Sequence, residues 1–520
     1  MNMDRVRVLW IDDEIDLLKP HVMFLEKKGY EVLTMNNGRD AIDALRSEAV
    51  DIVFLDEQMP GMSGLETLTE IKTMLPSLPV VMVTKSEEEQ IMEEALGSKI
   101  SDYLIKPVNP GQIVLAIKKQ LEAPRLEGEK SSMAYQQEFR NISMELSANL
   151  TYQEWEKVYK KLTYWDLELP KAGDEGLLEI LGTQKKEANL LFSKYIEKNY
   201  IDFINGRKGD NDFEMSHTVL KQKLFPLLNS DVPVFLLVID NLRYDHWKII
   251  QDELERYVKV ISDSTYMSIL PSVTHYARNS MFAGLLPTEI EKKYPQYWIP
   301  EDSNERKNQY EKELLEEYLK RYGKEPRVTF NKVLNHAYGM KLLDHLPRML
   351  QTPLNVIIYN FVDMLSHAST EVELLREMSS EETSYRSLVL SWVKHSPLVE
   401  LLKNLMGQRA IVVLTTDHGS VRITNPVRVK GDREASVNLR YKVGRNMEFD
   451  PQQVFYVRYP GDIFLPKVSM TASFIFCREN DFFVYPNNYN QYVGYYKDTI
   501  QHGGISMEEM MVPFAVMRPK

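Results

Sequence analysis

The chain has 520 residues, more than one hydrophobic core usually supports, so we expect two or three domains. Its 63 basic and 75 acidic side chains give a net charge of −12, which argues against non-specific coating of nucleic acid and against direct promoter binding. The single cysteine, Cys477, excludes an intramolecular disulfide framework and a cysteine-based metal cage. With no signal-like N-terminus and no apolar run of membrane-spanning length, the sequence favours a cytoplasmic protein.

The first domain, residues 1–122, is predicted to be a doubly wound α/β domain. Short apolar runs alternate with stretches of helical spacing, a rhythm that fits five strand-plus-helix units. The strands are expected at 6–11, 52–55, 80–83 and 103–105, and the helices at 17–28, 38–48, 64–74, 87–96 and 112–121.

The second domain, residues 123–205, is predicted to be a helical bundle with a connecting role. Residues 123–132 contain Pro124 and Gly128 among mixed charges and are interpreted as a linker. Helical spacing without a strand candidate then covers 133–146, 152–162 and 176–199.

The third domain, residues 206–520, is predicted to be a larger α/β domain. Its apolar strand candidates lie at 234–239, 258–262, 356–361, 411–415 and 474–476. The charged and aromatic segment 289–322, interrupted by Pro295 and Pro300, is typical of a cap inserted beside a site.

The first domain places three carboxylates at strand ends. Asp12 and Asp13 follow the first strand and Asp56 follows the third, so they are expected to converge and to share a hard cation such as Mg²⁺. Thr84 and Lys106 end the next two strands and offer a hydroxyl and an ammonium to a phosphoryl group bound at Asp56. Taken singly, each residue is as well explained by helix capping or surface solvation. Five positions in the right order favour a phosphoacceptor pocket.

These residues, with Met59-Pro60-Gly61 and Lys106-Pro107, resemble the receiver domain of bacterial response regulators. The resemblance implies phosphorylation of Asp56 by a sensor histidine kinase and Mg²⁺ held by Asp13, Asp56 and the Gln58 carbonyl, beside Asp12. It also implies a conformational readout at Thr84 and Tyr103, and phosphorylation-dependent dimerisation.

The third domain contains a second set of donors. Asp240, Asp363 and Asp417 each end a strand candidate, so one edge of the sheet is expected to gather them. The imidazoles of His367, His418 and His502 complete a set of six donors, too many for one zinc ion and suited to two ions of Zn²⁺ or Mn²⁺. Individually these residues are equally well explained as helix caps and buried core histidines.

The nucleophile is expected at a helix N-terminus near this edge, where free amide groups favour anions. In Pro271-Ser272-Val273-Thr274, just before a predicted helix, either hydroxyl is a candidate, and simple capping is the alternative for both. We prefer Thr274 and leave Ser272 open.

The segments at 240–243, 271–274, 363–367, 416–419 and 502–506 resemble the alkaline phosphatase superfamily, and the PglZ domain most closely. With the receiver, the chain resembles the PorX type of response regulator, associated with bacterial type IX secretion. The resemblance implies that Asp240, Thr274, Asp417 and His418 hold one zinc ion, that Asp363, His367 and His502 hold the other, and that Thr274 is the attacking group.

The substrate is expected to be a phosphodiester rather than a phosphomonoester. The run from Pro271 to Gly284 resembles the nucleophile segment of nucleotide pyrophosphatases and phosphodiesterases, and His275 stands where alkaline phosphatase itself has an arginine suited to a monoester. Arg422, Arg428 and Lys430 belong to the basic stretch 422–445, which is expected to dock a polyanion, with a solvated strand pair as the alternative.

The leading hypothesis is thus a response regulator whose effector is a zinc-dependent phosphodiesterase acting on nucleotides or short oligonucleotides. The alternative is a regulatory interaction protein that binds a sigma factor or a secretion component and keeps a structural or vestigial metal site.

Overall fold

The computed structural model describes residues 6–85, 100–207, 213–229, 231–324, 326–431, 436 and 438–520, and the predicted helix at 87–96 lies outside them. The chain divides into two compact units. One comprises Met1–Gln137 with Glu168–Glu175, and the other comprises Glu138–Leu167 with Gly176–Lys520. Among the described residues, none of the helices is both long and apolar enough to cross a membrane.

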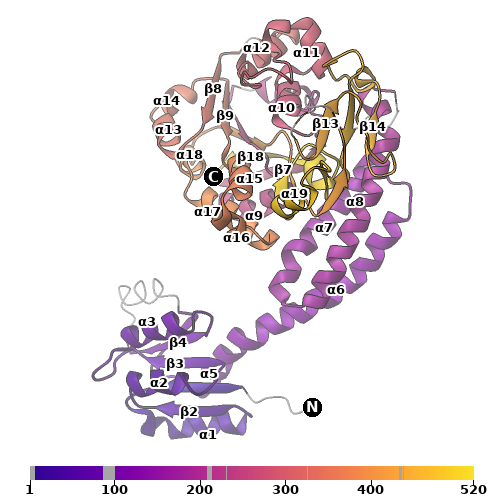
Figure 1. Cartoon of the computed structure of the whole chain (residues 1–520). Helices are drawn as coiled ribbons and strands as arrows, with labels where there is room; N and C mark the ends of the chain where they lie inside the picture. The colour runs from indigo at the N-terminus through magenta and orange to yellow at the C-terminus, as the bar shows by residue number, and fades with distance from the viewer. Residues whose placement is uncertain are drawn as a thin grey trace. The chain divides into compact units, whose positions relative to one another are not determined.

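The first unit contains a parallel five-stranded sheet in the order β2-β1-β3-β4-β5. Its strands are β1 (Arg7–Ile11), β2 (Glu31–Met35), β3 (Ile52–Asp56), β4 (Val80–Thr84) and β5 (Asp102–Ile105). Helices α2 (Gly38–Leu45) and α3 (Gly64–Met74) pack on one face, and α1 (Lys19–Lys27) and α5 (Pro110–Ile117) pack on the other (Figure 1). The predicted doubly wound domain is confirmed. Strand β2 was missed because it lies at the sheet edge, where its residues are only partly buried.

The predicted linker at 123–132 is wrong. A π-helical turn (Lys118–Glu122) runs directly into α6 (Ala123–Leu146), so the backbone is helical throughout the segment. Pro124 therefore lies inside a continuous helix, directly after the π-helical turn, where the hydrogen-bond ladder is already irregular and tolerates a residue without a backbone N–H.

Two long helices, α7 (Tyr152–Ala172) and α8 (Glu175–Ile204), belong largely to the second unit, where they pack on the larger α/β domain (Figure 1). The hydroxyl of Tyr200 accepts a hydrogen bond of 2.7 Å from the Leu270 amide, and Asn189 Nδ2 donates to Glu508 Oε2 at 2.9 Å. Helix α8 therefore contacts the segment that precedes Thr274 and the segment that follows His502.

The second unit is built on a six-stranded sheet in the order β7-β18-β10-β6-β9-β8. Its four strands β10, β6, β9 and β8 are mutually parallel, and β18 and β7 are antiparallel to their neighbours. The bounds are β6 (Val234–Ile239), β7 (Val258–Met267), β8 (Val328–Val333), β9 (Leu354–Tyr359), β10 (Ile411–Thr415) and β18 (Met511–Pro519). The predicted large α/β domain is confirmed, with β8 and β18 as strands that the sequence pattern did not reveal.

Smaller sheets pair β11 (Val421–Arg422) with β17 (Ile500–Gln501), β12 (Asn425–Arg428) with β16 (Asp481–Val484), and β13 (Tyr441–Gly444) with β15 (Ser473–Phe476) and β14 (Phe455–Val457). The helices are α9 (Tyr244–Leu254), α10 (Thr274–Ala283), α11 (Pro287–Lys293), α12 (Glu311–Arg321), α13 (His336–Leu343), α14 (Leu346–Met349), α15 (Phe361–Glu371), α16 (Glu373–Met378), α17 (Glu382–Lys394), α18 (Pro397–Leu405), α19 (Tyr489–Tyr496) and α20 (Met507–Met510). Helices α11 and α12 form the predicted cap segment.

Candidate metal centre and phosphoacceptor pocket

The strand ends of the second unit deliver most of the predicted metal ligands. Asp240 directly follows β6, and Asp417 and His418 follow β10, the strand beside it. His502 follows the short strand β17. Asp363 departs from the prediction, because β9 ends at Tyr359 and Asp363 lies in the first turn of α15. The helical spacing of four residues then places His367 on the same face as Asp363.

The donors form two groups. Asp240, Asp417 and His418 make one, Asp363, His367 and His502 make the other, and within each group the ligand atoms lie within 4.8 Å of one another. In the first group His418 Nε2 lies 3.8 Å from Asp240 Oδ1 and 3.7 Å from Asp417 Oδ2. His418 Nδ1 is 3.0 Å from the Gly419 carbonyl, so the ring presents Nε2 to the carboxylates.

The second group centres on the Asp363 carboxylate. Its two oxygens lie 3.6 Å from His367 Nε2 and 3.4 Å from His502 Nε2. The rings of His418 and His502 stack with centroids 4.4 Å apart, so the two groups adjoin each other. Burial alone would lower the pKa of His502, but the Asp363 carboxylate outweighs this effect and raises it.

The donor set fits divalent cations. Burial raises the pKa of the Asp417 carboxyl well above its ordinary value, and the neighbouring Asp240 raises it further. Asp417 Oδ2 is buried without a hydrogen-bond partner, and its ion pair with Arg278 Nη1 is long at 3.9 Å, so a bound cation would stabilise this carboxylate. Buried carboxylates that repel each other beside imidazoles are the chemistry of a site for two metal ions.

The two candidate hydroxyls have different surroundings. Thr274 Oγ1, at the first residue of α10, lies 3.3 Å from Asp240 Oδ1 and 3.1 Å from His418 Nε2. Ser272 is fully buried, and its Oγ donates to the Gly504 carbonyl at 2.9 Å. Thr274 therefore faces the first donor group, whereas Ser272 braces the turn that follows His502.

That turn is anchored by a buried ion pair that sequence reasoning missed. Arg440 Nη2 lies 2.6 Å from Glu509 Oε2, both side chains are inaccessible to solvent, and Glu509 Oε1 accepts from the Gly504 amide at 2.9 Å. Arg440 lies in the stretch that was expected to dock a polyanion, yet its guanidinium is used internally to fix the turn after His502.

Arg278 is the second residue that sequence reasoning missed. One helical turn after Thr274, its Nη1 lies 2.7 Å from Asp240 Oδ2, and its Nε donates to Glu311 Oε1 of the cap at 2.6 Å. The spacing of four residues from the nucleophile candidate was the only available signal. The partner in the cap is 33 residues away and was not predictable from spacing.

The cap segment contacts the residue beside Thr274. Glu301 accepts hydrogen bonds from Tyr276 at 3.0 Å and Tyr441 at 2.7 Å, and it lies 3.1 Å from His275 Nδ1. The His275 ring also stacks on Trp298 with centroids 4.7 Å apart. The cap thus holds the His275 imidazole beside Thr274.

The three basic side chains that were predicted to bind substrate each contact another side chain of the protein. Arg422 Nε donates to Glu382 Oε1 at 3.1 Å, the Arg428 guanidinium lies 4.5 Å from the Tyr489 ring centroid, and Lys430 Nζ lies 2.8 Å from Glu448 Oε2. Their part in substrate binding stays a prediction.

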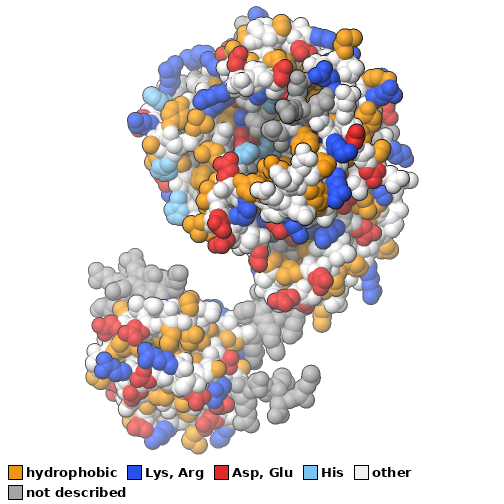
Figure 2. Space-filling view, viewed as in Figure 1, with side chains coloured by type: hydrophobic (Ala, Val, Ile, Leu, Met, Phe, Trp, Pro, Cys, Tyr) orange, Lys and Arg blue, Asp and Glu red, His pale blue; other side chains and the backbone are white. Residues whose placement is uncertain are grey.

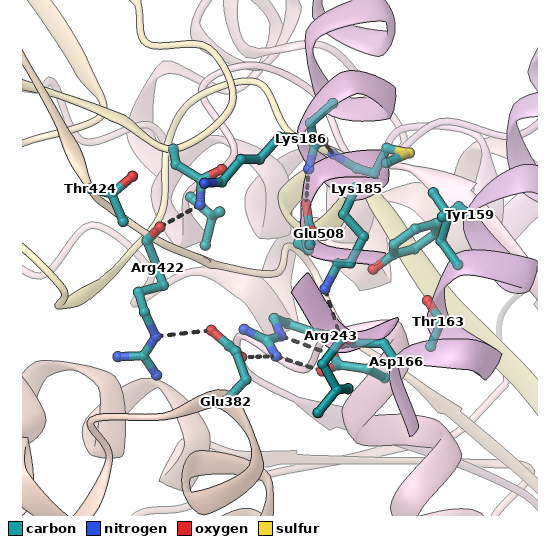
Figure 3. Close-up of a pocket in the computed structure, with 18 residues that line it drawn as sticks. Tyr159, Thr163, Asp166, Lys185, Lys186, Arg243, Glu382, Arg422, Thr424 and Glu508 are labelled. Atoms are coloured by element: carbon teal, nitrogen blue, oxygen red, sulfur yellow. Dashed lines mark hydrogen bonds and ion pairs between the residues drawn. The ribbon is translucent and has the colours of Figure 1, made fainter. Parts of the chain in front are cut away.

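A charged cavity of about 280 Å³ lies between α7, α8 and the loops that carry the metal ligands (Figure 3). Arg243, three residues after Asp240, pairs with Asp245 and with Glu382. Arg386 contacts the same Asp245 at 2.7 Å and also pairs with Asp166 of α7. The network ties the long helices to the loop of Asp240.

Replacing Asp245 by alanine is expected to lower the free energy of unfolding of the second unit by about 3–5 kcal/mol, because two buried guanidinium groups lose a shared carboxylate. The exposed Asp252 on the same helix is the control, with an expected change below about 0.5 kcal/mol. Urea unfolding followed by circular dichroism measures both, and equal midpoints for the two variants would contradict the expectation.

The first unit contains the predicted phosphoacceptor pocket. The ligand oxygens of Asp12, Asp13 and Asp56 lie within 4.8 Å of one another, and Lys106 Nζ lies 2.7 Å from Asp12 Oδ2 and 3.0 Å from Asp56 Oδ2. Burial raises the pKa of Asp56, while Lys106 opposes this shift. Thr84 Oγ1 donates to Glu57. Gln58 lies two residues after the end of β3.

The Tyr103 side chain is 42% exposed, so it lies on the surface of the first unit. The conformational readout that the receiver resemblance implies for Tyr103 stays a prediction. The carboxylates, Lys106 and Thr84 are thus assembled in the pocket, and the tyrosine is turned outward.

Comparison with known families accounts for most of the chain. Residues 219–517 match the family described as the BREX system PglZ alkaline phosphatase-like domain. Residues 125–204 match the PorX response regulator linker domain, and residues 8–118 match the response regulator receiver domain.

Individual relatives match in the first domain. The transcriptional regulatory protein ZraR of Klebsiella oxytoca is 37% identical over 126 residues, 24% of this chain and 28% of the relative. The alginate biosynthesis transcriptional regulatory protein AlgB of Pseudomonas putida is 35% identical over 120 residues, 23% of this chain and 27% of the relative. The chain therefore spans just over a quarter of the length of these relatives. Among solved structures, the chemotaxis protein CheY4 of Vibrio cholerae is 26% identical, with 22% of this chain and 99% of that chain covered and a TM-score of 0.22.

Proposed function

This chain is a two-component response regulator that belongs to the PglZ alkaline phosphatase-like family, and we propose that its output domain hydrolyses phosphodiesters in nucleotides or short oligonucleotides. The observation that carries the proposal is the position of Thr274 Oγ1, which lies 3.3 Å from Asp240 and 3.1 Å from His418, beside the two donor groups. A hydroxyl at a helix N-terminus next to such donors is the arrangement for nucleophilic attack on phosphorus.

Two Zn²⁺ ions fit the donors, one with Asp240, Thr274, Asp417 and His418 and one with Asp363, His367 and His502. When bound, they supply Lewis acidity and positive charge for phosphoryl oxygens.

The protein's own residues then perform two displacements. Thr274 Oγ1 attacks phosphorus, a phosphothreonine ester forms, and the first alcohol leaves. Water displaces Thr274 in the second step and releases a phosphomonoester. The N-terminus of α10, where Thr274 lies, favours the negative charge of a phosphoryl group.

The preference for a diester rests on the residue beside the nucleophile. His275 is held by Glu301 and Trp298, and Arg278 is held by Asp240 and Glu311. Neither side chain offers the free guanidinium fork that binds the extra anionic oxygen of a monoester.

The test compares matched substrates on the purified full chain with zinc. We expect turnover of bis-p-nitrophenyl phosphate and of a thymidine dinucleotide to exceed turnover of p-nitrophenyl phosphate by at least about ten-fold in kcat/KM. A preference for the monoester would reverse the assignment, and two bound zinc ions without turnover of any ester would favour a regulatory interaction protein.

The receiver domain implies a phosphodonor such as a sensor histidine kinase. We propose that Mg²⁺ binds Asp12, Asp13, Asp56 and the Gln58 carbonyl, that Asp56 accepts the phosphoryl group beside Lys106, and that phosphorylation promotes a homodimer.

Replacing Asp56 by asparagine is expected to abolish phosphate incorporation from acetyl phosphate with Mg²⁺, because the acceptor carboxylate is removed. Asp43, an exposed carboxylate of α2 paired with Arg46, is the matched control and is expected to leave incorporation unchanged. Mass spectrometry of the intact chain measures incorporation, and sedimentation shows whether the dimer follows it. An Asp56→Asn chain that still gains one phosphate would place the acceptor elsewhere.

We further propose that the chain regulates type IX secretion, as its resemblance to the PorX type of response regulator implies; residues 125–204 match the PorX response regulator linker domain. A sigma factor or a secretion component is the protein partner that such a role requires, since the net charge of −12 disfavours direct promoter binding.

A further inference from the structure

Helix α19 carries four tyrosines, and only two of them are needed by the fold. Tyr489 and Tyr496 pack against a buried cluster that includes Phe482 and Val484. Tyr492 and Tyr495 are not among the residues of that cluster and are 41% and 42% exposed. Figure 2 shows hydrophobic side chains gathered over α19, near pale-blue histidine atoms in a hollow of the larger unit.

The exposed rings are continuous with a ring that lines a cavity. Tyr492 stacks on Tyr496 with centroids 6.2 Å apart and planes 13° apart, and Tyr495 meets Tyr496 edge to face at 4.8 Å. Tyr496 lines a cavity of about 660 Å³ that is also lined by the metal-ligand candidate His367. A row of aromatic faces therefore leads from the candidate active site onto the surface.

The cavity wall offers hydrogen-bonding groups of the kind that read nucleobases. Gln501, Asn438 and Thr370 line it. Gln501 Nε2 donates to Thr370 Oγ1 at 3.1 Å and Asn438 Oδ1 accepts from the Arg440 amide at 2.7 Å, so the Gln501 oxygen and the Asn438 amino group are the atoms that a base would use. The volume of the cavity lies in the usual range for small-molecule sites and holds about one or two nucleotides. A longer ligand extends over Tyr492 and Tyr495.

Two arginines lie against the tyrosines of this helix. The Arg376 guanidinium is 5.0 Å from the Tyr495 ring centroid and donates to the Thr370 carbonyl at the cavity rim. The Arg428 guanidinium is 4.5 Å from the Tyr489 centroid. Aromatic rings interleaved with arginines are typical of surfaces that bind single-stranded nucleic acid.

Carboxylates of Glu301, Asp302 and Glu371 also line the cavity. They disfavour a ligand that binds mainly through its phosphates, so most of the affinity must come from stacking. A short single strand with few phosphates fits this balance better than a long polyanion.

We propose that Tyr492 and Tyr495 form a base-stacking platform for a short single-stranded oligonucleotide, whose scissile phosphodiester enters the cavity beside His367. The inference rests on the proposed diesterase function and adds the length and strandedness of the substrate. The two tyrosines select substrates by their bases, whereas the site beside Thr274 accepts diesters with or without bases.

The first test measures kcat/KM of the zinc-loaded full chain for a thymidine tetranucleotide and for methyl p-nitrophenyl phosphate, a diester without bases. The double variant Tyr492→Ala/Tyr495→Ala is expected to lose at least about ten-fold on the tetranucleotide and to retain its rate on the small diester. Tyr492→Phe/Tyr495→Phe keeps the rings and is expected to behave as wild type. Tyr338→Ala, which removes an equally exposed tyrosine from α13, is the matched control. Equal losses on both substrates, or no loss on the tetranucleotide, would overturn the proposal.

The second test separates the platform from the chemistry. Binding of a fluorescein-labelled tetranucleotide to zinc-loaded Thr274→Ala chain is followed by anisotropy, with and without the two tyrosine-to-alanine changes. Loss of binding with the tyrosines supports the platform even if no ester is turned over. If the tetranucleotide does not bind, or binds equally well after the two tyrosine changes, the stacking platform is contradicted. The exposed tyrosines would then be a surface for a protein partner. A shallow dependence on salt concentration is expected because stacking dominates, and a steep one would contradict that balance.

Discussion

Replacing Thr274 by alanine is expected to lower kcat for diester hydrolysis by at least about a thousand-fold, since the attacking oxygen is removed. Zinc content is expected to stay near the wild-type value, because three donors of the first group and all three donors of the second remain. Kinetics with a chromogenic diester and elemental analysis of the same preparation measure both quantities.

Two variants control for changes in structure. Ser272→Ala removes the hydrogen bond to the Gly504 carbonyl and is expected to lower activity only a few-fold. Thr274→Ser keeps a hydroxyl at the same position and is expected to retain part of the rate. A Thr274→Ala chain with more than a tenth of the wild-type kcat would move the nucleophile to another group.

Removing the metal ions with a chelator is expected to abolish turnover and to destabilise the second unit. Three buried or half-buried carboxylates, Asp240, Asp363 and Asp417, would then lie close together without their cations. A metal present at a thousand times its Kd stabilises a folded protein by about 4 kcal/mol, so the thermal midpoint is expected to fall by several degrees.

Zn²⁺ or Mn²⁺ is expected to restore both properties, and Mg²⁺ is expected to restore neither, because imidazole donors suit the borderline cations. The Asp417→Asn chain is the matched control, and its midpoint is expected to respond less to the chelator. Undiminished turnover in the chelated wild-type chain would contradict metal-dependent hydrolysis.

Sequence reasoning reached the metal donors because parallel strands end at one edge of a sheet, so apolar runs followed by acids predict convergence. Asp240, Asp417 and His418 obey that rule. Asp363 also lies at this edge, although it does not directly follow a strand. It belongs to the first turn of α15, and His367 follows it at helical spacing.

The residues that sequence reasoning missed act through contacts between distant segments. Arg440 pairs with Glu509 across 69 residues, and Arg278 reaches Glu311 in the cap. Arg440 sits in a basic stretch whose charge alone predicts solvent or ligand contact, and Arg278 is the one Lys, Arg, Asp or Glu residue of α10. Only the folded chain shows that both charges are compensated internally. The backbone through Pro124 shows the same limit, because a proline usually interrupts a helix and only the folded chain shows the helix continuing through it after a π-helical turn.

The central claim is that two metal ions bind beside Thr274, and anomalous diffraction at the zinc edge from crystals of the zinc-loaded chain tests it most directly. We expect two peaks, one among Asp240, Asp417 and His418 and one among Asp363, His367 and His502. Peaks only at other residues, or no zinc bound in these two groups, would contradict the account.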